Sequence, residues 1–223
     1  MTIRNAIAKG FKSLRRRPNS PLLQTSGTLA TTSFSVARAA GLSDEQLALD
    51  VNLVAVRGIA SVAAEFKKPL TVDIQDAYGS DLETAINALI DLDVAGINLE
   101  HCELATGDLS DIDEASSRIE RVLNVARRRD FVVNAGCDAL AKGRDLDEVL
   151  SHGKRCLAAG AISVLVWGAQ RGVPKDEVER LTIPAGLGVK QLAEIGVARI
   201  SIGPSLVFAS VKTLHDEAKK LLG

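Results

Sequence analysis

The sequence predicts an α/β protein, a TIM-type (β/α)8 barrel, and three observations support this fold class. Short runs of Val, Ile and Leu alternate with amphipathic stretches, as in parallel strands joined by helices. Three segments, ALIDLDVAGINL, CLAAGAISVLV and QLAEIGVARISI, repeat one plan in which a helix ends, turns and leads into a strand. Aliphatic residues far outnumber the five Phe, one Trp and one Tyr, which suits strands covered by helices.

The expected elements can be placed in order along the chain. We expect strands at Thr28–Thr32, Leu70–Ile74, Gly96–Leu99, Phe131–Asn134, Ile162–Val166 and Arg199–Ile202. We expect helices at Glu45–Phe66, Asp81–Leu92, Ile112–Arg129, Leu146–Ala159, Lys175–Leu181, Val189–Ile195 and Ser205–Leu222. Left-handed residues are expected to end three of the helices, at Asp93, Gly160 and Gly196. An open doubly wound sheet is the alternative fold, but no GxGxxG follows a strand, so a dinucleotide site is not expected.

Two places are too short for a complete set of eight units, which usually takes ~250 residues. PLLQT (Pro21–Thr25) resembles a strand, yet only Ser26 and Gly27 separate it from the next one. A parallel crossover needs about a dozen residues, so a helix is missing there. Between Leu181 and Val189 only TIPAGLG is available for a strand and both of its loops. The barrel is therefore expected to be incomplete, with its first helix and seventh strand compressed.

The chain is expected to consist of a basic N-terminal helix at residues 1–19 and one barrel domain with a C-terminal helix at residues 20–223. No Asp or Glu precedes Asp44, whereas Arg15–Arg17 and other N-terminal residues are basic. An Arg-rich, acid-poor start is typical of a mitochondrial presequence. The other interpretation is a surface helix with Ile7, Phe11 and Leu14 on one face, stopped by Pro18.

Composition argues against several function classes. Lys and Arg (27) nearly balance Asp and Glu (28), so a net charge of -1 gives no electrostatic basis for binding nucleic acid or an anionic membrane. No apolar run approaches the ~20 residues of a membrane span. Cys102, Cys137 and Cys156 are odd in number and form no CxxC, which indicates a reducing compartment. We therefore expect a cytoplasmic protein, with the mitochondrial matrix as the alternative.

Several His, Cys and Trp residues invite a functional interpretation but have a simpler structural one. We expect the three cysteines to be packing residues with inert thiols. His101 is either a group that supports metal ligands or an ordinary loop histidine. We expect solvated helix positions for His152 and His215, and packing at the barrel rim for Trp167.

Carboxylates stand at the ends of two successive strands, at Asp73 and Glu100. Catalytic groups of a (β/α) barrel lie at the C-terminal ends of its strands, so these two side chains are expected to converge. Mg²⁺ suits such a pair, because it prefers hard oxygen ligands and keeps several waters. Taken singly, Asp73 would be more simply explained as a helix N-cap or a loop carboxylate, but the pair at successive strand ends favours the metal site.

The segments around these residues resemble a known family. TVDIQDAYG resembles the DxDxGYG loop of the isocitrate lyase and phosphoenolpyruvate mutase superfamily, and AGINLEH resembles its GINLED strand. ATTSFSVARAAGLSD is similar to its second strand and following loop, VVNAGCD to its INARTD segment, and LAEIGVARISIGPSL to its last strand and helix. The match runs in order from about Thr28 to the C-terminus. Short members described as carboxyphosphonoenolpyruvate phosphonomutase-like or methylisocitrate lyase-like are the most similar.

The resemblance implies a Mg²⁺-dependent enzyme that acts on a small α-oxo or 2-hydroxy carboxylic acid through an enolate. It implies metal binding by Asp73, by Glu100 and, through water, by Gln75, with Asp44 as a third catalytic carboxylate. Family members commonly form tetramers, so the implied partners are a small carboxylate substrate and further copies of the chain. The implied substrate-binding residues are Thr31, Thr32, Ser33, Tyr78, Gly79 and Asn134.

The sequence also departs from the family pattern. A second loop carboxylate is replaced by Gln75, the arginine of the NARTD segment is Gly136, and the KKCGH loop is absent. Loss of the guanidinium removes a bidentate clamp for a carboxylate or phosphonate. Two alternatives to an active enzyme therefore stay open. One is a relic that keeps the barrel without turnover, and the other is a variant that has lost two segments.

Overall fold

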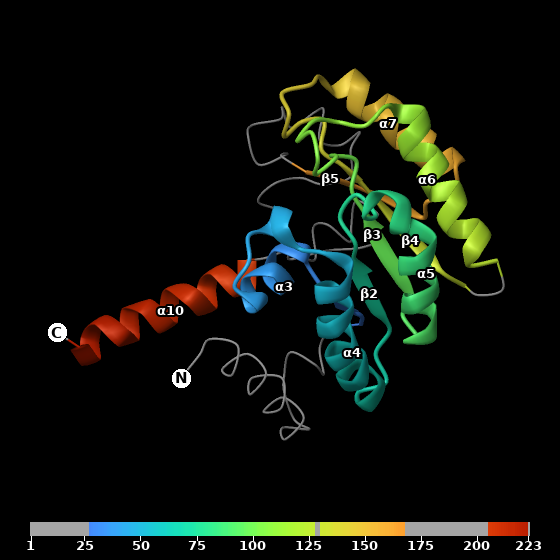
Figure 1. The fold of residues 1–223 in the computed structure, drawn as a ribbon. Helices are drawn as coiled ribbons and strands as arrows, with labels where there is room; N and C mark the ends of the chain where they lie inside the picture. Colours follow the sequence, from blue (N-terminus) through green and yellow to red (C-terminus); the bar gives the residue numbers. More distant parts are fainter. Residues whose placement is uncertain (1–26, 128–129, 168–204, 223) are drawn as a thin grey trace.

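The computed structural model describes residues 27–127, 130–167 and 205–222. In these ranges five strands form one parallel sheet in the order β1-β2-β3-β4-β5, which curls as part of a barrel wall (Figure 1). Every neighbouring pair is parallel and consecutive in the chain, as the barrel prediction requires. The strands are β1 (Leu29–Ala30), β2 (Leu70–Asp73), β3 (Gly96–Leu99), β4 (Val132–Cys137) and β5 (Ser163–Val166).

Helices connect these strands, and α4, α5, α6 and α7 follow one another along one side of the sheet (Figure 1). Because each of them runs from the end of one strand to the start of the next, the C-terminal ends of the strands share one edge. The helices are α3 (Ser33–Ala40), α4 (Leu49–Glu65), α5 (Leu82–Asp91), α6 (Ile112–Val125), α7 (Leu146–Ala158) and α10 (Ser205–Leu222). Two short 3-10 turns are η1 (Asp44–Gln46) and η2 (Gly79–Asp81).

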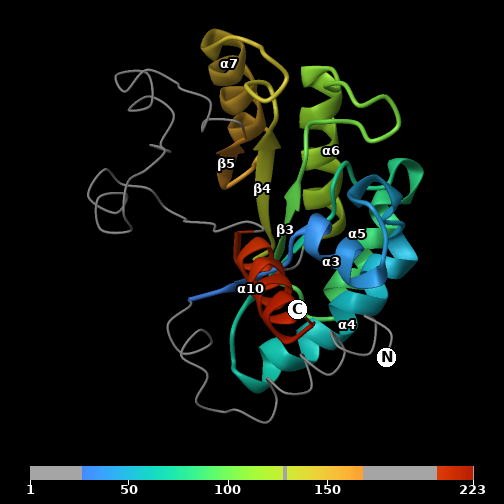
Figure 2. The ribbon, with the colours of Figure 1, turned by 90° about the vertical axis from the view of Figure 1, so that its left-hand side faces the viewer.

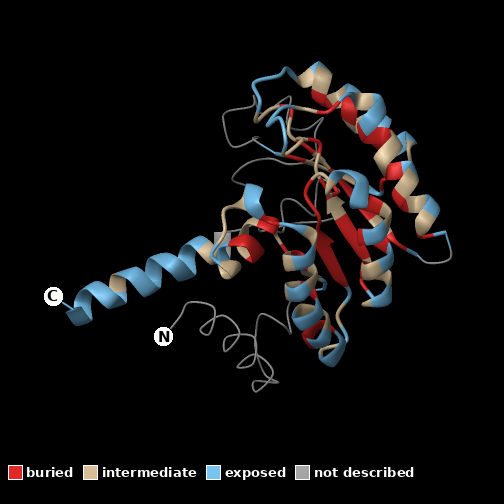
Figure 3. Ribbon diagram, in the orientation of Figure 1, coloured by how far each residue is buried: buried red, intermediate tan, exposed pale blue. Residues whose placement is uncertain are grey.

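The core lies along the middle strands, which are buried on both faces (Figure 3). Val72, Ile97 and Val133 are in register across β2, β3 and β4, and each is 0% exposed. The tight approach of β3 to β4 depends on Gly96, since a Cβ there would lie 2.3 Å from the Val132 carbonyl oxygen. Burial on both faces explains why these strands read as continuous apolar runs.

Three helices, α3, α6 and α7, begin with a side-chain cap that satisfies an otherwise unpaired N–H group. Thr32 caps α3 by accepting from Ser35 N. Asp111 caps α6 and Asp145 caps α7 in the same way. These caps place the beginning of each helix directly after the loop that leaves the C-terminal edge of the sheet.

The structure confirms the order of the strands and helices and corrects their detail. The segment after the first strand was expected to be a strand end and loop, yet it forms α3, because Thr32 caps a short helix that Gly41 ends in left-handed conformation. The long helix expected from Glu45 is interrupted at Leu47 and Ala48, between η1 and α4. Two of the expected left-handed helix ends are confirmed, with φ 57° at Asp93 and 106° at Gly160.

Several expectations concern segments outside the residues that the structure describes. These are the basic helix at 1–19, both compressed segments, the third left-handed helix end, and the elements expected at 175–181, 189–195 and 199–202.

The C-terminal helix α10 stands apart from the sheet and its covering helices (Figures 1 and 2). Near its start, Phe208 contacts Phe34 of α3, with ring centroids 5.2 Å apart. His215 is exposed, as predicted, whereas Trp167 was expected to pack and is 51% exposed. No described helix combines the length and apolar content needed to cross a membrane.

Candidate metal and substrate site

Asp73 is the last residue of β2, and neighbouring groups hold its carboxylate on both sides. Its Oδ2 accepts a hydrogen bond from Ser33 N at 2.9 Å, and its Oδ1 accepts one from Gln75 N at 3.1 Å. Its own backbone N–H donates to Thr31 Oγ1 at 2.9 Å. The carboxylate is thus fixed at the C-terminal edge of the sheet, with only 7% of the residue exposed.

Gln75 connects this strand end to Asp44 in the loop before α4. Its Nε2 donates to the carbonyl oxygen of Asp44 at 2.8 Å and to Asp44 Oδ1 at 3.1 Å. Gln75 is completely buried, and its Oε1 has no hydrogen-bond partner within the described part of the chain. An unpaired buried acceptor is costly, so this oxygen is suited to a water or a cation.

Glu100 follows β3, and its backbone N–H donates to the Gln75 carbonyl oxygen at 2.7 Å. This bond ties the end of β3 to the loop after β2. Burial, and then the charges of Asp73, Asp138, Asp44 and Asp76, raise the pKa of Glu100 to about 9. The four named charges are all negative, and each of them disfavours ionised Glu100.

The other two carboxylates of the group are shifted in the same direction. Burial raises the pKa of Asp73 to about 6, against the lowering effect of the Ser33 and Gln75 backbone hydrogen bonds. Burial also raises the pKa of Asp44, which the Ser33 hydroxyl partly opposes. Among the described ion pairs, none includes Asp44, Asp73 or Glu100. Three neighbouring carboxyl groups thus lack a described positive partner.

This arrangement fits a hard cation that keeps part of its water shell. Within residues 27–127, 130–167 and 205–222, no group of three His, Cys, Asp or Glu side chains forms a ready-made metal cage. Mg²⁺ does not require one, since it is usually bound by one or two carboxylates and completes its coordination with water and substrate oxygens. Asp73 and Glu100 would supply the carboxylates, and Gln75 Oε1 could accept from a coordinated water.

The three residues expected to bind substrate, Thr31, Thr32 and Ser33, follow β1 and make hydrogen bonds within the protein. Thr31 accepts from Asp73 N, Ser33 donates to the Asp73 carboxylate, and Thr32 caps α3. Thr31 and Ser33 therefore brace Asp73, a role that the sequence alone did not indicate. The substrate-binding role of the three residues stays a prediction.

The remaining expected substrate residues divide into two groups. Tyr78 and Gly79 adopt left-handed conformation in the loop beside Asp73, with φ 58° and 61°. Asn134 is 4% exposed and lies within the sheet. Its Nδ2 donates to Ile97 O and Asn98 Oδ1, both at 3.2 Å, and its Oδ1 accepts from Ser163 Oγ at 2.5 Å. The amide of Asn134 is therefore already engaged in holding β3, β4 and β5 together.

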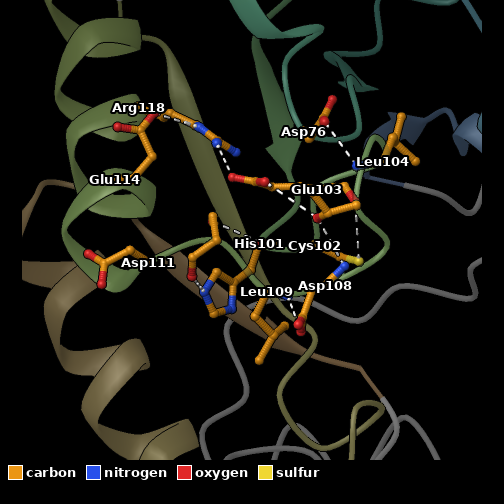
Figure 4. Close-up of polar contacts among 12 residues, drawn as sticks. Asp76, His101, Cys102, Glu103, Leu104, Asp108, Leu109, Asp111, Glu114 and Arg118 are labelled. Atoms are coloured by element: carbon orange, nitrogen blue, oxygen red, sulfur yellow. Dashed lines mark hydrogen bonds and ion pairs between the residues drawn. The ribbon is translucent and has the colours of Figure 1, made fainter.

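The loop from β3 to α6 is held on several sides (Figure 4). Asp76 Oδ2 accepts from Leu104 N at 3.0 Å, and Arg118 pairs with Glu103 at 3.1 Å. Lys142 Nζ bonds the carbonyl oxygen of Gly107. This loop is therefore fixed to the loop after β2, to α6 and to the segment after β4.

The histidines and cysteines near this loop can now be placed. His101 is 3% exposed and bonds the Ser110 carbonyl oxygen through Nε2 at 2.8 Å, so it is a buried structural histidine. His152 was expected to be solvated, but it is 9% exposed because α7 packs it against His101, with ring centroids 4.3 Å apart. Cys102 is partly exposed, and burial raises the pKa of its thiol. Cys137 and Cys156 are buried, as predicted.

Two functional neighbours of the site were not identified from the sequence. Asp138 Oδ2 accepts from His101 N at 3.2 Å and Cys102 N at 3.0 Å, and so orients the loop after Glu100. Asn52 of α4 donates to the carbonyl oxygen of Asp73. A signal for Asn52 was present: it occupies the buried stripe of α4 with Val56 and Val62, where an apolar residue is expected.

Comparisons with known proteins agree with the fold. A protein from Burkholderia cenocepacia, a candidate phosphonomutase, superposes with a TM-score of 0.80 at 31% identity, covering 94% of this chain and 90% of the other. A phosphonopyruvate hydrolase in complex with oxalate and Mg²⁺ gives a TM-score of 0.77 at 20% identity, covering 99% and 87%. An uncharacterized protein of Mycobacterium tuberculosis is 30% identical over 186 residues, 78% of this chain and 69% of its own length. The family profile described as phosphoenolpyruvate phosphomutase matches residues 22–222, so the chain belongs to that family.

Proposed function

We propose that the chain is a Mg²⁺-dependent lyase-like or phosphonomutase-like enzyme that acts on a small α-oxo or 2-hydroxy carboxylic acid through an enolate. The observation that carries this proposal is a group of three carboxylates with raised pKa values and without a described cationic partner: Asp73 and Glu100 at the ends of β2 and β3, and Asp44 in η1. Asp73 and Glu100 would hold the ion directly or through water, and Asp44 would complete the catalytic carboxylates.

When bound, Mg²⁺ supplies Lewis-acid stabilisation of negative charge on a substrate oxygen. The protein's own residues set the geometry: Ser33 and Gln75 hold the Asp73 carboxylate, and Gln75 holds Asp44. The substrate carboxylate would lie near Thr31, Thr32 and Ser33, where α3 begins and its positive helix end favours an anion.

The relatives support the same reaction class. One solved relative is a 2,3-dimethylmalate lyase, with a TM-score of 0.79 at 16% identity, covering 99% of this chain and 87% of the other. Another is the phosphonopyruvate hydrolase bound to oxalate and Mg²⁺. The first name denotes cleavage of a C–C bond and the second cleavage of a P–C bond, so both bond types are tested below.

Thermal unfolding with Mg²⁺, with oxalate, and with both together tests the proposal, because a ligand that binds only the folded state raises its melting temperature. Oxalate is a planar mimic of an enolate. We expect the pair to raise the melting temperature more than the sum of the separate shifts. Equal melting temperatures in all conditions, with EDTA as the metal-free reference, would refute a magnesium-and-carboxylate site.

A second candidate function is metal and ligand binding without turnover, and Gly136 is the observation that favours it. A Cβ at this position would lie 3.2 Å from Glu100 Cα, so Glu100 occupies the space beside β4 where relatives are expected to carry an arginine. A set of 2-hydroxy acids and phosphonates, assayed for release of an α-oxo acid or phosphate, separates the two. Stabilisation by Mg²⁺ and oxalate together with no product would favour binding alone.

We also propose that the chain forms a homo-oligomer through α10. Its exposed apolar side chains include Phe208, Val211 and Leu214, which are 54%, 59% and 71% exposed. A helix with this much uncovered apolar surface is suited to burial against another copy. Light scattering after size exclusion is expected to give a mass above that of one chain, and Leu214→Glu is expected to lower it.

A further inference from the structure

The loop that follows Asp73 has an unusual backbone. Gln75, Ala77 and Tyr78 have φ values of 52°, 75° and 58°, and Gly79 has 61°. Left-handed conformation is costly for residues with a side chain and persists only where the surroundings enforce it. Three such residues among the four positions 75–78 therefore require strong anchoring beside the proposed metal carboxylate.

One side chain from outside the loop spans it. Asn52 lies on α4 and is 2% exposed. Its Nδ2 donates to the carbonyl oxygen of Asp73 at 2.9 Å and to the hydroxyl oxygen of Tyr78 at 2.6 Å. A single amide group thus joins the end of β2 to the far end of the left-handed loop.

Hydrogen-bonding chemistry fixes the orientation of this amide. The Asp73 carbonyl can only accept, so the atom facing it must be Nδ2 and not Oδ1. With its second N–H directed at Tyr78, the amide makes the phenol oxygen an acceptor. The hydroxyl hydrogen of Tyr78 is then left to donate to another group, such as a substrate oxygen.

The Oδ1 atom of Asn52 indicates that this residue does not serve packing alone. Its Oδ1 is buried and has no hydrogen-bond partner in the described part of the chain. Leaving a buried acceptor unpaired costs free energy that an apolar residue of similar size would avoid. What Asn52 offers that an apolar residue would not is therefore its pair of donated hydrogen bonds, to Asp73 O and Tyr78 Oη.

We propose that Asn52 is a positioning residue, whose amide fixes the Asp73 carboxylate and the Tyr78 hydroxyl relative to one another for metal and substrate binding. This inference rests on the proposed magnesium function and extends it to a residue on α4. Asn52 would contact neither the metal ion nor the substrate. It acts through the backbone of one residue and the phenol of the other.

The test uses the full chain and measures Mg²⁺ binding by calorimetry and by fluorine NMR. Tyr78 is the only tyrosine, so fluorotyrosine labelling gives one resonance that reports on this position. Asn52→Leu keeps the branched shape of the side chain and removes both donated bonds. We expect its dissociation constant for Mg²⁺ to rise about tenfold, as for other residues that orient metal ligands. We also expect its metal-free resonance to move and its response to Mg²⁺ to shrink.

Two further variants keep the test informative. Val56→Ala loosens the same helix one turn away without touching the amide, and is expected to lower stability but leave Mg²⁺ affinity and the resonance shift unchanged. Tyr78→Phe removes only the phenol oxygen, and is expected to weaken Mg²⁺ binding less than Asn52→Leu. If Asn52→Leu does not fold, a Tyr78→Phe variant with wild-type affinity would still overturn the inference.

The outcomes separate this inference from the function on which it rests. Wild-type affinity and an unchanged resonance response in Asn52→Leu would overturn the positioning role alone. Equal losses of affinity in Asn52→Leu and Val56→Ala would also overturn it, because the effect would then follow helix stability. A wild-type chain that does not respond to Mg²⁺ would overturn both proposals.

Discussion

The C-terminal ends of β2 and β3 differ sharply from the middle of β4 and the start of β5, although all four strands belong to one parallel sheet. At β2 and β3, Asp73 and Glu100 are crowded by other carboxylates, and burial raises both pKa values. At β4 and β5, Asn134 and Ser163 bond each other, and the Asn134 amide also bonds β3. The first region holds buried carboxylates without a described cationic partner, whereas the polar side chains of the second region hydrogen-bond one another and the backbone.

This difference indicates where a ligand can contribute most. A cation placed between Asp73 and Glu100 would relieve charge repulsion that the folded chain otherwise carries. Beside Asn134, a ligand would first have to displace hydrogen bonds that stabilise the sheet. Substitutions that change charge at the ends of β2 and β3 are therefore expected to change metal binding. Substitutions at Asn134 and Ser163 are expected to change stability.

Asp73→Asn should have the largest effect on the first region. It removes one of the two proposed carboxylate ligands, so Mg²⁺ affinity is expected to fall by at least two orders of magnitude. Metal-free stability should change by less than about 1.5 kcal/mol, because loss of a buried charge offsets the loss of one accepted hydrogen bond. Calorimetric titration and urea unfolding measure the two quantities.

The matched change in the second region is Asn134→Leu. It leaves Ile97 O without its amide partner and Ser163 Oγ without its acceptor, so we expect a loss on the order of 2–3 kcal/mol in the free energy of unfolding. Mg²⁺ affinity should stay close to wild type. A large loss of affinity in this variant would show that the two regions do not behave separately.

The pH dependence of stability gives the next largest effect. Folding raises the pKa of Asp73 from 3.8 to about 6 and that of Glu100 from 4.5 to about 9. At any pH between the unfolded and the folded pKa of a group, the folded state therefore binds more protons than the unfolded state. Metal-free stability should fall as the pH rises from about 4.5, first through the pKa of Asp73 and then through that of Glu100. Urea unfolding from pH 5 to 9 should show this decline, and saturating Mg²⁺ should reduce it.

Glu100→Gln isolates the upper part of that decline, because it cannot lose a proton. The difference in stability between variant and wild type should grow as the pH rises from about 4.5 to about 9, and it should vanish at lower pH. Parallel curves over the whole range would contradict the assignment of the shift to Glu100. This control also cancels the titration of histidines and cysteines elsewhere.

Gly136→Ala should have the smallest effect, at the boundary between the two regions. Its Cβ would lie 3.2 Å from Glu100 Cα and 3.4 Å from Leu99 O, which are backbone atoms that cannot swing aside. We expect a loss of about 1–2 kcal/mol from this overpacking. Gly58→Ala, on α4 with open space around it, should instead stabilise the chain by about 0.5–1 kcal/mol. Equal effects of the two substitutions would show that the backbone contact at Gly136 is unimportant.

Local patterns were sufficient to predict most of the described fold. The apolar runs of β2 and β3 and the amphipathic periodicity of α5, α6 and α7 are strong because each element buries a continuous face. The helix α3 was missed because its eight residues are too few for a periodic signal, although Thr32 and Gly41 mark its ends. His152 was misplaced because its burial depends on contact with His101, fifty-one positions earlier in the chain.

The sequence by itself determined the family, the order of the strands and the positions of the two carboxylates at the ends of β2 and β3. These depend on residue identity and spacing, which a chain retains whether or not it is folded. Only the tertiary structure decided how those carboxylates are held: Ser33 and Gln75 bond Asp73, Asn52 reaches it from α4, and Asn134 turns into the sheet. Such contacts join residues far apart in the chain, and their geometry exists only after the helices and strands have packed.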